Sequence, residues 1–159
     1  MPVEFLTDDQ VVAYGRVPAA LSRGQIERWW HFDDADRGCI DRRRRAHNRV
    51  GFGVQLGTVR MIGRFQDDPL DVPTAVLDYV AEQLGEDASN VKAYGQRPKT
   101  ALEHTWEIRR VFGYRDYLDA ADEFTAWLDA RAWTTGDGPK ASSTRRSSGC
   151  VTARSCCPR

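Results

Sequence analysis

The stretch DRRRRAHNRVGFGVQLGTVRMIGRF, residues 41–65, decides the fold of this chain. Its first part is a cationic cluster, and its second part carries apolar residues at the spacing of one helix face: Val50, Val54, Val59 and Ile62. We expect a buried helix over about residues 48–62, preceded by arginines that a rigid core holds at the surface. Fixed cations suit a protein that grips phosphates, although a charge run is also an ordinary solvated surface.

Three glycines, Gly51, Gly53 and Gly57, interrupt this predicted helix. Each costs about 1 kcal/mol relative to alanine in a helix interior, so something must compensate. We expect a neighbouring helix to approach closely at these positions. Because no strand precedes the glycines and their spacing matches no phosphate-binding loop, a nucleotide site is not indicated.

Helices are also predicted on both sides of this stretch. Capping-box spacings mark three helix starts: Thr7 with Gln10, Ser22 with Gln25, and Thr100 with Glu103. Another helix is expected to begin near Asp33 and to end among the arginines 42–45, where the helix dipole favours cations. Further helices are expected after Pro73 and from Asp116. Because no alternating strand pattern appears, we predict an all-α, compact multi-helix bundle.

The net charge of zero hides a change of composition near residue 140. Residues 141–159 hold four of the 23 basic residues, none of the 23 acidic ones and three of the four cysteines, so residues 1–140 carry a net charge of −4. Any nucleic-acid contact must therefore come from local patches. The tail lacks helix or strand periodicity, and its cysteine spacings fit no zinc site. We predict a helical domain over residues 1–140 and a disordered tail over residues 141–159.

A frameshift in the gene is our hypothesis for the origin of this tail. Shifted by one base, codons compatible with residues 142–158 encode Leu-Phe-Asp-Ala-Ala-Val-Glu-Trp-Leu-Arg-Asp-Arg-Glu-Val-Leu-Leu-Pro. That peptide is an amphipathic helix ending in proline. The alternative is a genuine disordered tail, and the nucleotide sequence of the gene distinguishes the two.

The sequence argues against several classes of protein. It shows no Ser/His/Asp arrangement, zinc spacing or cofactor loop, and Cys39 lies in a helical pattern without an evident activating base. No apolar run approaches the roughly 20 residues needed to cross a bilayer, and the first residues have no cationic leader. We therefore expect a cytoplasmic protein that is not an enzyme, uses no metal or cofactor and does not enter a membrane.

Several ordered phrases resemble the N-terminal domain of class II replicative transposases, the Tn3 family. They lie at residues 1–7, 41–44, 47–52, 55–60, 67–73, 99–109 and 114–116, and the resemblance covers about residues 1–140. It implies a helical region that helps to bind the terminal inverted repeats of the transposon. It also implies that strand transfer, by a distant ribonuclease-H-like core with acidic residues and magnesium, lies outside this chain. We therefore expect a truncated DNA-binding fragment without a catalytic core.

Two basic stretches supply the predicted contacts with double-stranded DNA at transposon ends. One phosphate track would use Arg42, Arg43, Arg44 and Arg49, and another would use Arg97, Lys99, Arg109 and Arg110. Candidates for reading bases are His47, Asn48, Gln96 and His104, although such residues more often cap helices or satisfy a core.

Two alternatives to DNA binding remain open at this point. One is a helical protein-interaction module of the transposition complex, with self-association in the parent protein, because some of the five tryptophans could form an exposed apolar patch. The other is a non-functional remnant.

Overall fold

The computed structural model describes residues 7–115 and 118–134. Over these residues the chain forms eight α-helices, two short 3-10 helices and no strand, which confirms the all-α prediction. The elements are α1 (Asp8–Ala13), α2 (Arg23–Trp30), α3 (Asp34–Ile40), α4 (Ala46–Ile62), α5 (Thr74–Leu84), η1 (Ala88–Val91), α6 (Lys92–Gly95), α7 (Pro98–Phe112), η2 (Leu118–Ala120) and α8 (Ala121–Thr134). The predicted disordered tail lies outside the described residues.

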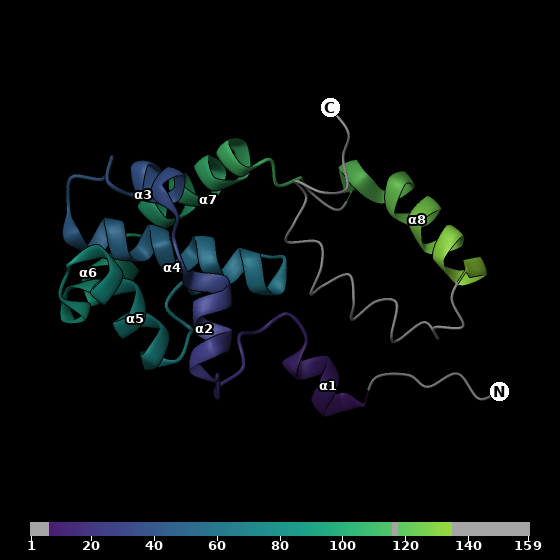
Figure 1. Cartoon of the computed structure of the whole chain (residues 1–159), viewed down its shortest axis with the longest axis horizontal. Helices are drawn as coiled ribbons and strands as arrows, with labels where there is room; N and C mark the ends of the chain where they lie inside the picture. Colours follow the sequence, from purple (N-terminus) through teal and green to yellow (C-terminus); the bar gives the residue numbers. More distant parts are fainter. Residues whose placement is uncertain (1–6, 116–117, 135–159) are drawn as a thin grey trace.

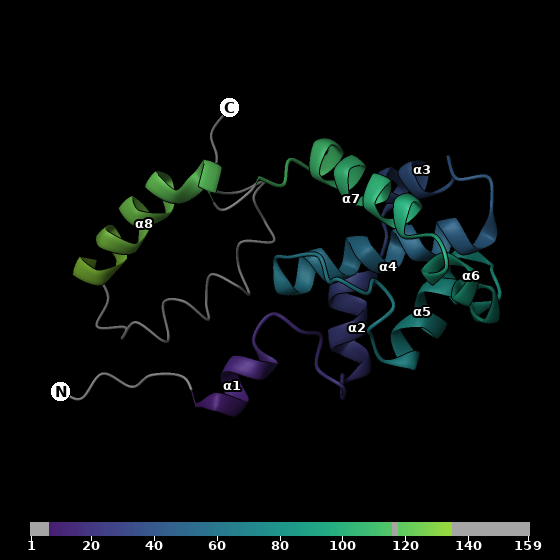
Figure 2. The ribbon, with the colours of Figure 1, turned by 180° about the vertical axis from the view of Figure 1, so that it is seen from behind.

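Helix α4 runs through the middle of the bundle that α2 to α7 form (Figures 1 and 2). It contacts α2, α3, α5, η1, α6 and α7. All ten residues from Val50 to Val59 are buried, so this helix is covered on every side along its central turns. The short α1 and the C-terminal α8 lie to one side of this bundle in both views.

The glycines of α4 make room for aromatic rings of its neighbours. A Cβ atom at Gly51 would lie 2.4 Å from the ring of Tyr94, and one at Gly57 would lie 2.0 Å from the indole of Trp30. The close approach predicted from the sequence is therefore present, but side chains fill it rather than a neighbouring backbone. The buried indole of Trp30 also donates a hydrogen bond to the Val54 carbonyl over 3.2 Å.

The connection from α2 to α3 is tied to α5 by polar contacts. The side-chain amide of Gln83 donates to the Trp30 carbonyl over 2.7 Å and accepts from the Phe32 amide over 3.2 Å. The Arg60 guanidinium forms an ion pair with the buried Asp36 of α3 over 2.7 Å. These contacts fix the start of α3 relative to α4 and α5.

Helix boundaries followed the local signals in some places and not in others. Both capping-box side-chain contacts predicted at Thr7 and at Ser22 are present. The predicted start at Thr100 is wrong, because Pro98 already occupies the first turn of α7, where its fixed φ suits a helix. Helix α3 ends at Ile40, so the four arginines lie beyond it, in the connection to α4.

Candidate nucleic-acid interface

The arginine run occupies the connection between α3 and α4, and its members differ in exposure. Arg42, Arg44 and Arg45 are exposed, whereas Arg43 is only 8% exposed. Arg45 is the N-cap residue of α4 and has an extended backbone. Because this connection is short and irregular, successive side chains point in different directions, and only some of the predicted phosphate contacts lie at the surface.

Arg43 points into the bundle. Its guanidinium carbon lies 4.0 Å from the centre of the Phe52 ring, and the group forms an ion pair with Glu107 of α7 and a hydrogen bond to the Cys39 carbonyl. A buried guanidinium needs such partners, because leaving it unpaired would cost several kcal/mol. The predicted surface position of Arg43 is therefore wrong, and this residue joins α7 to the start of α4.

Arg49 is also held by internal partners. It forms an ion pair with Glu86, which follows α5, and donates to the Arg43 carbonyl over 3.0 Å. Its side chain is 27% exposed and that of Glu86 is 15% exposed. Because the carboxylate already occupies the guanidinium, the expectation that Arg49 presents a free cation to DNA is corrected as well.

The second predicted phosphate track is spread over both ends of α7. Arg97 is the N-cap residue of this helix, and Arg97 and Lys99 are exposed at its N-terminal end. Arg109 is half-buried, with its guanidinium carbon 5.6 Å from the centre of the Phe65 ring, whereas Arg110 is exposed. Lys99 and Arg110 are eleven positions apart in the helix, which is about 16 Å along the axis. The four cations therefore do not form one compact patch.

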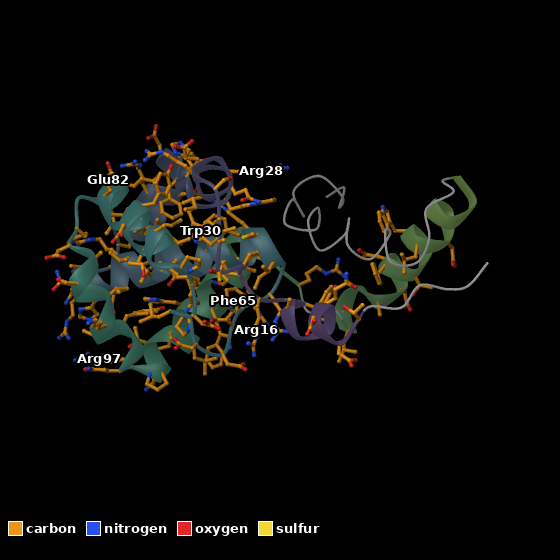
Figure 3. The ribbon with its side chains drawn as sticks, turned by 90° about the horizontal axis from the view of Figure 1, so that it is seen from below. Arg16, Arg28, Trp30, Phe65, Glu82 and Arg97 are labelled. Atoms are coloured by element: carbon orange, nitrogen blue, oxygen red, sulfur yellow. The ribbon has the colours of Figure 1, made fainter. Side chains whose placement is uncertain are left out.

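The two basic stretches meet at His47, in the first turn of α4. Burial, followed by the positive charges of Arg45 and Arg97, lowers the pKa of His47 below the ordinary histidine value. Two arginines that are far apart in the sequence thus act on one imidazole. Figure 3 shows Arg97 at the outer edge of the bundle, on the side away from Arg28.

We call the exposed cations of this region the basic edge: Arg42, Arg44, Arg45, Arg97 and Lys99. Its centre is formed by the N-termini of α4 and α7, and neither N-cap arginine makes a side-chain cap hydrogen bond. Helix N-termini carry a partial positive charge from free backbone N–H groups, which adds to the charge of the arginines. The arrangement favours an anion spread over several contacts. Arg45 was missed by the sequence analysis, and its place within the arginine run was the available signal.

The candidate base readers also differ in position. Gln96 is exposed next to Arg97, whereas the Nε2 atom of His47 and the Oδ1 atom of Asn48 are buried without a hydrogen-bond partner among the described residues. His104 lies inside the bundle, with its Nδ1 atom 2.8 Å from the Tyr94 hydroxyl. Burial, followed by the charge of Arg43, lowers the pKa of His104 to about 4, so its ring is a neutral core group near pH 7.

Within residues 7–115 and 118–134, no group of three or more His, Cys, Asp or Glu side chains is arranged to hold a metal ion. No helix in the same ranges is long and apolar enough to cross a membrane.

The comparison with known proteins identifies the family. Residues 5–141 match the family model described as "Domain of unknown function (DUF4158)". The chain belongs to this family. It is 37% identical over 142 residues to the transposase for transposon gamma-delta of Escherichia coli K12, which covers 87% of this chain and 14% of that protein. The resemblance to Tn3-family transposases is thereby confirmed.

Two further relatives are also named as transposases. The DUF4158 chain is 31% identical over 111 residues to the transposase for transposon Tn1546 of Enterococcus faecium, covering 70% of this chain and 11% of the relative. It is 33% identical over 109 residues to the transposase for transposon Tn501 of Pseudomonas aeruginosa, covering 65% of this chain and 11% of that relative. The chain thus spans about a seventh or less of the relatives' length. No solved structure matches it.

Proposed function

We propose that this chain is the DNA-binding N-terminal part of a Tn3-family transposase and recognises the terminal inverted repeats of a transposon. The observation that carries the proposal is the exposure of five cations before and at the N-terminal ends of α4 and α7, two helices that pack against each other. Relatives of this chain are named as transposases for transposons, and the resemblance of the sequence to the N-terminal domain of that family implies binding to transposon ends. The strand-transfer chemistry belongs to parts of those proteins that this chain does not span.

The basic edge would hold the phosphate backbone and set the position of the domain on the duplex. Phosphate contacts fix register and orientation, whereas base contacts give sequence preference. Residues 1–140 are acidic overall, with a net charge of −4, so the attraction is local and falls with salt. With four to five phosphate contacts, affinity would drop by roughly a factor of 10² to 10³ between about 50 and 200 mM salt.

The proposal keeps four of the eight residues predicted from the sequence and adds Arg45. Arg42, Arg44, Arg97 and Lys99 remain, because their side chains are exposed at the basic edge. The residues left out are Arg43, Arg49, Arg109 and Arg110. The first two are held in ion pairs, Arg109 packs beside Phe65, and Arg110 lies at the opposite end of α7.

A titration against DNA tests this function. The full chain is added to labelled duplexes that carry either the inverted repeat of a related transposon or a scrambled sequence of the same length, at two salt concentrations. We expect tighter binding to the repeat and a salt slope of about −4. The variant Arg45→Gln/Arg97→Gln should bind more weakly, with a slope reduced by about 2.

A matched double variant removes two arginines elsewhere. Arg16→Gln/Arg28→Gln changes the formal charge by the same amount, away from Arg97 in Figure 3, and should bind as the unchanged protein does. Equal loss of affinity in both double variants would show that only the total charge matters. Unchanged binding by the Arg45→Gln/Arg97→Gln variant would overturn the assignment of the basic edge.

A further inference from the structure

The outward face of α7 carries an exposed apolar stripe. Trp106 is 61% exposed and Leu102, one turn before it, is 49% exposed. On the opposite face of the same helix, His104 and Ile108 are buried against the bundle. A tryptophan can bury 150–250 Å² of surface on contact, so this stripe is a larger apolar area than scattered surface residues provide.

Two opposite charges flank the tryptophan on this face. Glu103 lies about one turn before Trp106 and Arg110 about one turn after it, and both are exposed. Residues seven apart lie on the same side of an α-helix, because seven residues complete nearly two turns. Within the described ranges neither Glu103 nor Arg110 forms an ion pair. The stripe therefore has a negative end, an indole centre and a positive end.

This order of charges is complementary to itself. If a second α7 packs antiparallel across a two-fold axis near Trp106, Glu103 of one copy faces Arg110 of the partner subunit, and the reverse pair forms on the other side. A two-fold contact uses the same patch on both subunits, so such self-complementarity is what it requires. Central apolar anchors surrounded by charged pairs are also the usual order in protein interfaces.

A groove beside the stripe adds room for a partner's side chain. It has a volume of about 650 Å³, lies between α7 and the segment after α4, and includes the side chains of Phe65, Pro69, Leu70 and Leu102 in its lining. Leu102 belongs to both features, so an indole approaching across the two-fold axis would meet apolar surface on the groove side as well.

We propose that the α7 face formed by Leu102, Glu103, Trp106 and Arg110 docks against the same face of a second copy of this chain. The contact is a single helix pair, so the association is weak, with a dissociation constant of roughly 10⁻⁵ to 10⁻⁴ M, as for small transient interfaces. Of the basic edge, Arg42, Arg44 and Arg45 precede α4 and lie outside this face, whereas Lys99 lies one turn before Glu103 on the same side of α7.

Sedimentation velocity of the full chain without DNA tests the pairing, over a range of concentrations centred on roughly 50 μM. The unchanged protein should shift from monomer to dimer across that range. Trp106→Ala should stay monomeric throughout. Glu103→Arg alone should also stay monomeric, because arginines then face arginines, and Arg110→Glu alone should do so because glutamates face glutamates.

Charge exchange then identifies the partner. The double variant Glu103→Arg/Arg110→Glu should dimerise again, and an equimolar mixture of the two single variants should form heterodimers although neither associates alone. Glu82→Arg on α5 serves as a control and should dimerise normally. Circular dichroism checks that each variant is folded.

The opposing outcomes are equally distinct. A monomer at every concentration would overturn the proposal and leave the stripe to another partner, such as a different part of the longer transposases. A dimer whose charge exchange is not reciprocal would overturn the assignment to α7. Since no DNA is present, failure of this pairing would leave the DNA-binding proposal unaffected.

Discussion

The indole of Trp30 lies against the backbone of Gly57, with its Cδ1 atom 2.0 Å from the point where a Cβ atom would be. The ring is fully buried and hydrogen-bonded to the Val54 carbonyl. A glycine that weakens the helix by itself therefore allows α2 and α4 to pack closely. This contact predicts whether replacing Gly57 raises or lowers the free energy of unfolding, a direction that helix propensity alone would misjudge.

Gly57→Ala should lower the free energy of unfolding although alanine is the better helix former. The methyl group gains about 1 kcal/mol in propensity, but it forces the Trp30 ring from its position, and overpacking of this kind costs typically 1–3 kcal/mol or more. We expect a net loss of about 1–2 kcal/mol in urea denaturation. Gly38→Ala in α3 meets nothing within 4 Å and should leave stability equal or raise it, which would separate packing from propensity.

Arg43→Met should destabilise the fold without removing a DNA contact. The substitution leaves Glu107 without its buried partner and removes the cation from the Phe52 ring, so we expect a loss of about 2–4 kcal/mol on thermal or urea unfolding. Arg44→Met, at the exposed neighbour, should change stability by less than about 0.5 kcal/mol. Under conditions where Arg43→Met is folded, an unchanged salt slope of DNA binding would agree with its internal role, and a reduced slope would not.

The stability of the bundle should fall with acid through His104. The pKa of this buried histidine is lowered to about 4, whereas an unfolded histidine has a pKa of about 6.5. The unfolded state therefore binds the proton first, and stability that is complete above pH 6.5 is lost as the pH falls toward 4. Between pH 6.5 and 5 this amounts to about 2 kcal/mol.

Urea denaturation of the His104→Asn variant isolates that contribution. The variant should be less stable than the unchanged protein at pH 7, because it replaces a packed ring beside Tyr94 and Phe52. Its disadvantage should shrink by about 2 kcal/mol at pH 5, since asparagine does not take up a proton. If the free energy of unfolding fell equally with acid in the two proteins, His104 would not be the cause of the acid sensitivity.

The pKa of His47 reports directly on the basic edge. Burial is the largest cause of the lowered pKa of His47, and the charges of Arg45 and Arg97 lower it further. Replacing both arginines with glutamine should therefore raise the pKa of His47, as measured by NMR titration of the ring protons. The pKa of His104 should stay unchanged in the same spectra. A bound duplex should also raise the pKa of His47, because phosphate charge favours the protonated ring. No change in either experiment would place Arg45 and Arg97 away from His47.

Local signals in the sequence account for the helix ends that depend on neighbouring residues. Gly63, Gly85 and Gly113 end α4, α5 and α7 with φ values of 73°, 65° and 73°, as expected for glycine at a left-handed helix terminus. The capping box at Ser22 is equally local. The start of α7 was misplaced because a proline at the first helical turn and a capping box two residues later gave competing signals.

The direction of each arginine could not be predicted in the same way. Arg43 and Arg49 differ from Arg44 only through their partners, Glu107 and Glu86, which lie on elements far along the chain. A charge run in the sequence shows that cations are close together, and tertiary packing decides which of them stay at the surface. The same limit explains why the sequence does not link Arg45 with Arg97, which are 52 positions apart.

The enclosure of the central turns of α4 has a consequence for any attempt to divide this protein. Its central residues include three glycines and several β-branched side chains, a composition that gives little helix in isolation. A peptide with the sequence of residues 46–62 would therefore be mostly coil in water. If the domain were cut in the turn after α4, the first half would hold α4 without α5, η1, α6 and α7, and the second half would lack α4, so the two would acquire order only on recombination.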